Sequence, residues 1–113
     1  MDDRRSESRR HLIYYIRILH AHSGQLLGHL VNITPTGMAL ISEIPPVVNE
    51  TYSVKMSMPK DYRGLMELKF KVRCIWTRID QEELHLSGYE IFGLNDLEQA
   101  ALTWLVKHFG FDT

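Results

Sequence analysis

A cluster of arginines near the start of the chain has the residue types and spacing to bind a phosphate. Arg5 and Arg9 lie four positions apart, and Arg4 and Arg10 flank them. A guanidinium group presents a planar fork of donors that matches phosphate oxygens, and its face stacks on aromatic rings, purines included. Two such groups on one segment could close over a compact anionic ligand. The alternative is a solvated arm that only aids solubility, since charge runs are usually solvated.

A second cluster, residues 32–37, combines polar side chains with a turn. Asn32 carries amide donors and a carbonyl acceptor, which suit the edge of a guanine, and Thr34 adds a hydroxyl. Gly37 lacks a Cβ, so a flat ligand could approach the backbone. Pro35 favours the first central position of a type I turn, and we expect Gly37 at the positive φ that follows. The two clusters together predict a site for a nucleotide with phosphates and purines, although these residue types also favour turns by themselves.

Six β-strands are predicted to position these clusters. They span residues 12–20, 26–33, 38–42, 51–58, 66–76 and 84–92. The pattern is clearest in the fifth strand, where apolar and polar residues alternate with the period of two that a half-buried strand requires. We expect its apolar face to be buried, with Cys74 as an inert thiol in the core. That face comprises Met66, Leu68, Phe70, Val72, Cys74 and Trp76.

The last segment changes period and is predicted to form a helix over residues 96–109. Asn95 is a favourable N-cap, and Glu98 can complete a capping box. Six strands with short turns and one terminal helix favour a mainly β fold, a six-stranded antiparallel β-barrel whose open end the helix plugs. The predicted inner face of the helix comprises Leu97, Ala101, Trp104, Leu105 and His108.

The composition fits one small globular domain, with 44% hydrophobic and 24% charged residues over 113 positions. We predict a flexible basic arm over residues 1–11 and a single barrel domain over residues 12–113. The formal net charge of -1 argues against duplex DNA or an anionic membrane as a partner. A single cysteine, a polar N-terminus and the absence of an apolar run of membrane-spanning length predict a cytoplasmic protein.

Both clusters resemble the motifs of the PilZ domain family, bacterial receptors of the second messenger cyclic di-GMP. Arg5 and Arg9 match the family's two arginines, which are separated by three residues and precede the first strand. Asn32 and Gly37 match the ends of its Asp/Asn-x-Ser-x-x-Gly motif, and Thr34 stands where the family usually has serine. The resemblance covers nearly the whole chain, because the last two strands and the closing helix also look like the second half of the family's domain.

The resemblance implies a cyclic di-GMP receptor or adaptor that changes conformation or partner binding when it captures its ligand. Arg5 and Arg9 would grip phosphates and stack on guanine. Asn32 and Thr34 would hydrogen-bond a guanine and a nearby phosphate, and Gly37 would keep the turn open. Thr34 departs from the family pattern, since it keeps the hydroxyl of serine but adds a methyl group.

The arginine that directly precedes the first motif carries a further implication. In the family that this chain resembles, an arginine at this position tends to accompany an intercalated pair of ligands and a dimer. Arg4 occupies the position here. The resemblance therefore implies two ligands per protomer and a homodimer, with Arg10 adding positive charge. It also implies a downstream protein partner, which the sequence does not name.

Two other functions remain open on the sequence. One is a PilZ-like adaptor that acts only through protein contacts and binds no nucleotide, and the presence of both Arg5 and Arg9 argues against it. The other is a small barrel that binds RNA. Such a barrel requires a basic strand face studded with aromatic residues, whereas the polar strand faces here mix both signs of charge.

The sequence contains no motif of catalysis or of metal binding, which predicts a protein that is not an enzyme and uses no cofactor or metal. It has no Gly-rich phosphate loop, no Gly-x-Ser-x-Gly elbow and no His-Glu-x-x-His helix. His20 and His22 would share one face of a strand. A metal site needs three or four ligands, so we expect these histidines to be ordinary residues at the end of a strand.

Overall fold

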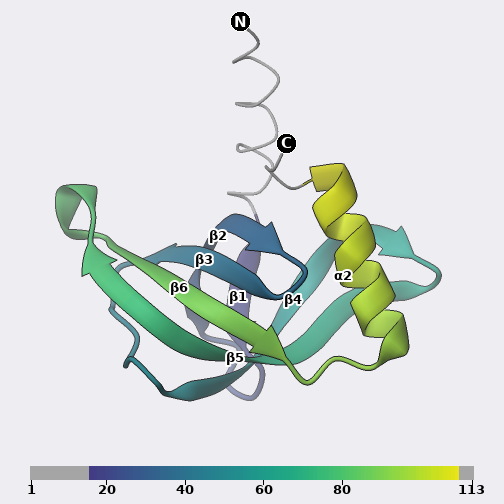
Figure 1. Ribbon diagram of the computed structural model, residues 1–113, viewed down its shortest axis with the longest axis horizontal. Coiled ribbons are helices and arrows are strands. Elements are labelled where there is room, and N and C mark those ends of the chain that lie inside the picture. Colours follow the sequence, from purple (N-terminus) through teal and green to yellow (C-terminus); the bar gives the residue numbers. More distant parts are fainter. Residues whose placement is uncertain (1–15, 110–113) are drawn as a thin grey trace, which may run out of the picture.

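The structure, a computed structural model, describes residues 16–109 of the chain. Its strands close into a barrel in the order β1-β2-β3-β6-β5-β4, and all neighbouring pairs are antiparallel (Figure 1). This confirms the predicted antiparallel barrel with a C-terminal helix, while the predicted arm and the first residues of the first predicted strand lie outside the described residues. The elements are β1 (Arg17–His20), β2 (Leu26–Thr34), β3 (Gly37–Ser42), β4 (Thr51–Tyr62), β5 (Leu65–Ile79), the short 3-10 helix η1 (Gln81–Glu83), β6 (His85–Phe92) and α2 (Asp96–Phe109).

The hairpin of β4 and β5 is longer than predicted. The sequence predicts a loop over residues 59–64, but pairing continues until Tyr62 meets Leu65. The turn is reduced to Arg63 and Gly64, both with positive φ (53° and 84°), as the tight hairpin turns that match strand twist require. Proline is tolerated within β4 because the register shifts between Ser57 and Tyr62, so the ladder is irregular there.

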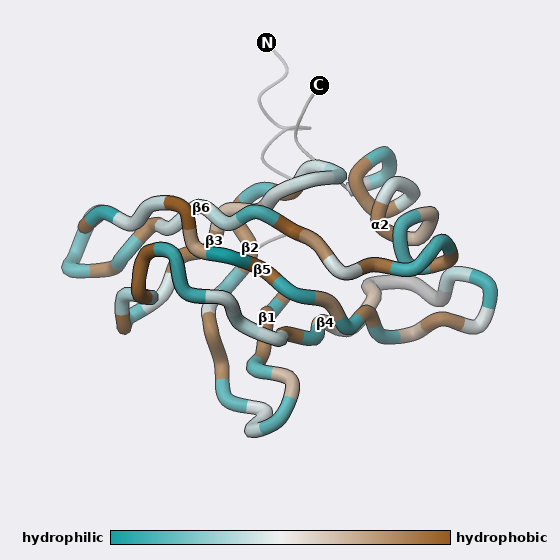
Figure 2. The backbone as a smooth tube through the Cα atoms, turned by 60° about the horizontal axis from the view of Figure 1, so that its bottom comes forward, coloured by the Kyte–Doolittle hydropathy of each residue, from teal (hydrophilic) through white to brown (hydrophobic). Residues whose placement is uncertain are grey.

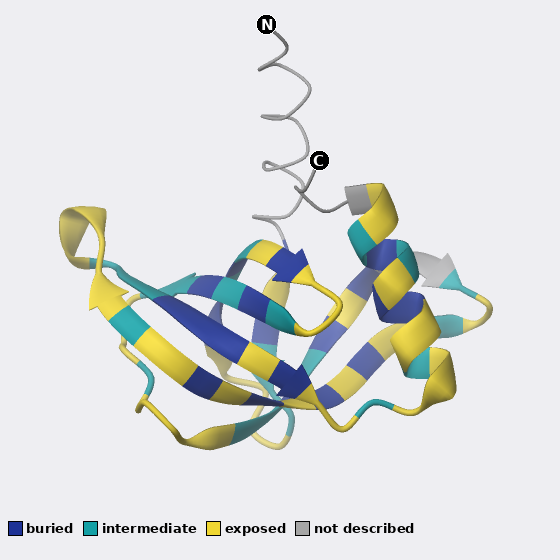
Figure 3. Cartoon of the chain, in the orientation of Figure 1, coloured by how far each residue is buried: buried dark blue, intermediate teal, exposed yellow. Residues whose placement is uncertain are grey.

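The barrel core follows the predicted alternation along β4 and β5. Figure 2 shows the hydropathy alternating along the β5 tube, and Figure 3 shows buried and exposed residues in the same rhythm. The alternation ends earlier than predicted. Met66 is 68% exposed at the hairpin end, and Trp76 is 41% exposed because the register shifts between Cys74 and Trp76 and turns the indole outward. The buried residues of the two strands are Val54, Met56, Met58, Leu68, Phe70, Val72 and Cys74.

Helix α2 begins at the predicted residue and is capped as predicted. The Asn95 amide donates to Oε1 of Glu98 (2.9 Å), and the Glu98 amide donates to Oδ1 of Asn95 (2.8 Å). The predicted inner face is correct for Ala101 and Leu105 but wrong for Leu97 and His108. Leu97 and His108 are exposed, Trp104 is half-buried, and the fully buried residues are Ala101, Leu102 and Leu105.

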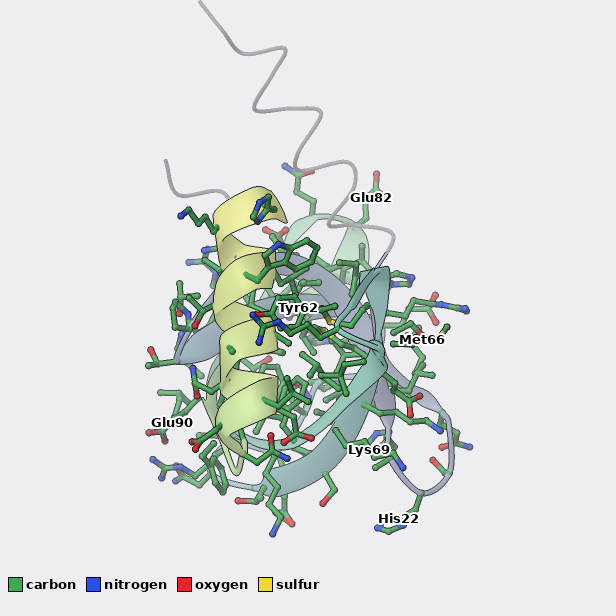
Figure 4. All side chains as sticks on the ribbon, turned by 90° about the vertical axis from the view of Figure 1, so that its right-hand side faces the viewer. His22, Tyr62, Met66, Lys69, Glu82 and Glu90 are labelled. Carbon is green, nitrogen blue, oxygen red and sulfur yellow. The ribbon has the colours of Figure 1, made fainter. Side chains whose placement is uncertain are left out.

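The half-buried side of α2 contacts the end of the β4–β5 hairpin. Tyr62 lies beneath the helix in Figure 4, with its ring centroid 5.4 Å from that of Trp104. Trp104 in turn lies 4.8 Å from the ring of His108, whose Nδ1 hydrogen-bonds the Trp104 carbonyl. These contacts fix α2 across one side of the barrel.

None of the helices within residues 16–109 has both the length and the apolar character that crossing a bilayer requires.

Candidate functional site

The described residues of the second cluster lie together at one pocket on the barrel surface. Asn32 and Thr34 come from the end of β2, and Gly37 begins β3 across the turn. They line an open pocket of about 260 Å³ together with residues of β3, β5 and β6. The structure therefore brings the three predicted residues to one place. The other lining residues are Met38, Ala39, Ile75, Trp76, Gly88 and Tyr89.

The hydroxyl of Thr34 is engaged in closing the turn between β2 and β3. Its Oγ1 accepts the amide of Gly37 (3.0 Å) and that of Thr36 (3.3 Å), and it donates to the carbonyl of Gly37 (3.3 Å). A serine would make the same bonds. Because Thr34 is exposed, its extra methyl group occupies no space that the fold needs. The hydroxyl of Thr34 thus stabilises the turn between β2 and β3.

Gly37 serves the site for a different reason from the one predicted. The sequence predicts a positive φ here, but among the described residues the glycines with positive φ are Gly24, Gly64 and Gly93. Gly37 lies in the ladder, opposite Glu90 of β6. A Cβ on Gly37 would lie 3.0 Å from the carbonyl oxygen of Tyr89, which is tighter than ordinary contact. The glycine therefore permits close approach of β6 rather than an unusual backbone conformation.

Asn32 follows an irregularity in β2 that sets its orientation. The register between β2 and β3 shifts between Leu30 and Asn32, as at a β-bulge, and bulges re-aim the side chains next to them. Oδ1 of Asn32 accepts the amide of Ile33 (2.9 Å). The side chain is exposed, and its NH₂ group remains as a donor pair toward the pocket.

Trp76 and Gly88 form a part of the site that sequence reasoning missed. Trp76, predicted to lie in the core, instead exposes its indole over β6, where it pairs with Gly88. A Cβ on Gly88 would collide with the indole, so only glycine leaves room for it. The guanidinium of Arg78 lies over the Trp76 ring at 5.6 Å from its centroid. A glycine inside an otherwise apolar strand is the sequence signal that could have revealed this close approach.

Tyr89, which lines the pocket, and its neighbour Cys74 resist ionisation. Tyr89 and Cys74 face each other across β6 and β5 and are both buried. Burial raises the pKa of the Tyr89 hydroxyl, and the nearby Cys74 and Tyr52 raise it further. Burial likewise raises the pKa of the Cys74 thiol, against a smaller opposing effect of its bond to the Trp76 carbonyl (3.5 Å). Both groups therefore stay neutral at physiological pH.

The remaining predicted site residues lie where the structure gives no position. Arg4, Arg5, Arg9 and Arg10 are outside the described residues, so their place at the pocket stays a prediction. Within residues 16–109, no group of three or more His, Cys, Asp or Glu side chains is arranged to hold a metal. His22 projects from the tip of the loop between β1 and β2, as Figure 4 shows.

Comparison with known proteins identifies the fold and the family of the chain. The chain is similar to a solved structure of the Bacillus subtilis inhibitor of motility (MotI/DgrA), with a TM-score of 0.64 and 13% sequence identity. That likeness covers 82% of this chain but 44% of the other, so this chain spans less than half the length of that protein. A search of curated proteins found no match. The sequence model of the PilZ domain matches residues 3–108, nearly the whole chain, and the chain therefore belongs to the PilZ domain family.

Proposed function

We propose that this chain is a receptor for cyclic di-GMP, bound at the pocket that Asn32, Gly37 and Trp76 line. The observation that carries the proposal is the convergence of the second motif with an exposed indole in one open pocket. Members of the PilZ domain family are receptors and adaptors rather than enzymes, and the pocket offers recognition groups only. The turn presents amide donors, while the indole presents a flat face.

We infer that the two arginines of the first motif reach this pocket when ligand binds. The carbonyl of Ile16, where the described chain begins, accepts the amide of Leu30 (2.9 Å), two residues before Asn32 on β2. Arg9 precedes Ile16 by seven residues. A chain of that length extends at most about 25 Å, which is enough to bring a guanidinium group over the pocket. The first described residue thus lies beside the strand that carries the second motif.

The size of the pocket indicates which part of the ligand it would hold. Pockets for drug-sized ligands usually enclose roughly 300–1,000 Å³, and this one holds about 260 Å³. We infer that it takes one guanine base, stacked on Trp76, while the arginines cover the phosphates. Because Oδ1 of Asn32 already accepts the Ile33 amide, its NH₂ group is the part left to donate. That group can donate to O6 of guanine, whereas adenine carries an amino donor at this position. Guanine would therefore be preferred over adenine.

Calorimetric titration of the full chain tests the proposal. Cyclic di-GMP should bind with a Kd on the order of 10 µM or tighter, and cyclic di-AMP should bind far more weakly. Arg5→Ala and Arg9→Ala should each weaken binding by about 2 kcal/mol, roughly thirtyfold, as expected for charge-assisted bonds to phosphate. Arg63→Ala is the matched control, because this exposed arginine stacks on Tyr62 at the far end of the β4–β5 hairpin. Absence of heat with cyclic di-GMP well above that concentration would end the proposal.

The second candidate is a PilZ adaptor that acts through protein contacts without nucleotide. The observation that favours this second candidate is the hydroxyl of Thr34. It is hydrogen-bonded within the turn and is therefore not free for a ligand while the turn is closed. Amide chemical shifts separate the two functions. A receptor should show ligand-induced shifts at Gly37 and Gly88, and an adaptor should show none there.

Stoichiometry and assembly follow from the same titration. Two ligands per protomer, as an arginine at position 4 suggests by resemblance, would give a stoichiometry of two, and Arg4→Ala should lower it to one. Light scattering with and without ligand would show the expected homodimer. We place the receptor in the cytoplasm, where the lone thiol of Cys74 would stay reduced.

A further inference from the structure

A larger pocket of about 610 Å³ lies away from the nucleotide pocket and contains none of its lining residues. It is formed by the start of β2, the end of β3, the loop of residues 43–50 and the residue before β6. Figure 1 shows that loop and α2 on opposite sides of the barrel. One side is thus closed by the buried residues of α2, while the other keeps an open pocket, which we call the open-end pocket. Among its lining residues are His20, Leu26, Ile41, Ile44, Tyr52 and Leu84.

The open-end pocket presents large apolar side chains to solvent. Leu26 is 48% exposed and Ile44 is 79% exposed, and both line it. Val47 and Val48, on the same loop, are 60% and 42% exposed. Exposed apolar side chains gathered at a pocket mark interaction sites in soluble proteins, because leaving them in water is unfavourable.

The loop that carries these side chains is anchored to the barrel. The amide of Val47 donates to the hydroxyl of Tyr52 (2.9 Å). The amide of Asn49 donates to the carbonyl of Cys74 (2.7 Å), and the amide of Cys74 donates to the carbonyl of Glu50 (3.1 Å). The apolar residues are therefore held in place by bonds to β4 and β5, so the surface is formed before any partner binds.

One carboxylate lines the open-end pocket, and two more lie next to a lining residue in the sequence. Glu43 lines the pocket, and Glu82 and Glu83 directly precede the lining residue Leu84. All three carboxylates are exposed, and within residues 16–109 none of them forms an ion pair. No lysine or arginine lines the pocket. Beside His20 and His29, the negative charge of Glu43 in the lining favours a positively charged partner, both in steering its approach and in choosing its register.

We propose that the open-end pocket binds a segment of a partner protein that presents large apolar side chains flanked by lysine or arginine. The apolar side chains would cover Leu26 and Ile44, and the basic residues would face Glu43, Glu82 and Glu83. The proposal does not rest on nucleotide binding. The open-end pocket and the nucleotide pocket share no residue, so both can be occupied at the same time.

Selection of short randomised peptides displayed against the immobilised full chain tests this inference. The enriched peptides should combine large apolar residues with lysine or arginine. Their binding should weaken by about tenfold or more in Ile44→Ser and in Glu43→Lys, a difference of roughly 1.4 kcal/mol. Met66→Ser and Glu67→Lys are matched controls, since both residues are exposed on β5 near its hairpin end, where Figure 4 shows Met66 pointing away from the barrel. The controls should bind like the unchanged chain.

Several results would overturn the inference. One is a selection that enriches no peptide, or peptides without basic residues. Another is a selected peptide that binds Ile44→Ser as tightly as the unchanged chain, with thermal melting showing that the variant is folded. A dimer in light scattering that Ile44→Ser converts to monomer would assign the pocket to a second copy of this chain instead.

Discussion

The indole of Trp76 lies directly on the backbone of Gly88, so that a Cβ on this glycine would be 2.5 Å from Cε2 and 2.8 Å from Cζ2 of the ring. The two residues are paired across β5 and β6, next to the register shift that turns the indole outward. A flat aromatic surface is thus held at the edge of the pocket that Asn32 and Gly37 line. The proposed stacking of a guanine depends on this relationship.

Gly88→Ala should displace the Trp76 indole and weaken cyclic di-GMP binding. Stacking of one base on an aromatic side chain contributes about 1–3 kcal/mol. The affinity for cyclic di-GMP should therefore fall by about tenfold or more. Calorimetry measures the affinity, and the indole N–H resonance, assigned with Trp76→Phe, reports the displacement. Trp76→Phe keeps a ring and should lose less than Trp76→Ala. An unchanged affinity in Gly88→Ala with a shifted indole resonance would show that the ring does not contact the ligand.

Thr34→Ser should leave both stability and ligand affinity nearly unchanged, because the hydroxyl keeps its bonds within the turn. Thr34→Val keeps the shape of the side chain but leaves the Gly37 amide without its acceptor. We expect it to lower the free energy of unfolding by about 1 kcal/mol and to weaken ligand binding through the altered turn. Urea unfolding and calorimetry check these outcomes. The neighbouring Thr36→Val is the control, and a loss there equal to that of Thr34→Val would contradict the assigned role.

Asn95→Ala should destabilise the protein by about 1 kcal/mol, because the Glu98 amide at the start of α2 loses its cap. Asn95→Asp retains an acceptor at the same position and should cost little. The comparison is made by urea unfolding at neutral pH. Since α2 closes one side of the barrel with Ala101, Leu102 and Leu105, the loss should appear in global unfolding rather than only in helix content.

The stability of the fold should fall at alkaline pH. Burial raises the pKa of Cys74 and Tyr89 above their ordinary values of 9.0 and 10.0, so the unfolded chain loses these protons first. The contribution of the two groups is complete below about pH 9 and decreases as the pH rises, by about 1.4 kcal/mol per pH unit for each group that is ionised only in the unfolded state. Urea unfolding between about pH 8 and pH 11 measures the slope. Tyr89→Phe should reduce the slope of the free energy of unfolding against pH above about pH 10. An identical slope in that variant would contradict the role assigned to Tyr89.

The sequence by itself determined the strand pattern and the helix start, because both rest on local interactions. The alternation along β4 and β5 needs only the period of two of a strand, and the capping box needs only Asn95 and Glu98 three positions apart. The motif of Asn32, Thr34 and Gly37 was likewise visible as a group, since one turn holds it together.

Only the tertiary structure decided which distant residues share the pocket and what each one does there. Trp76 faces outward because a register shift in the ladder between β5 and β6 changes its side, and that shift depends on how the two strands are aligned. Gly37 and Gly88 are required by atoms of other strands, namely the Tyr89 carbonyl and the Trp76 ring, rather than by their own φ angles. Contacts of this kind depend on how separate strands are aligned in the closed barrel, and that alignment is a property of the whole fold.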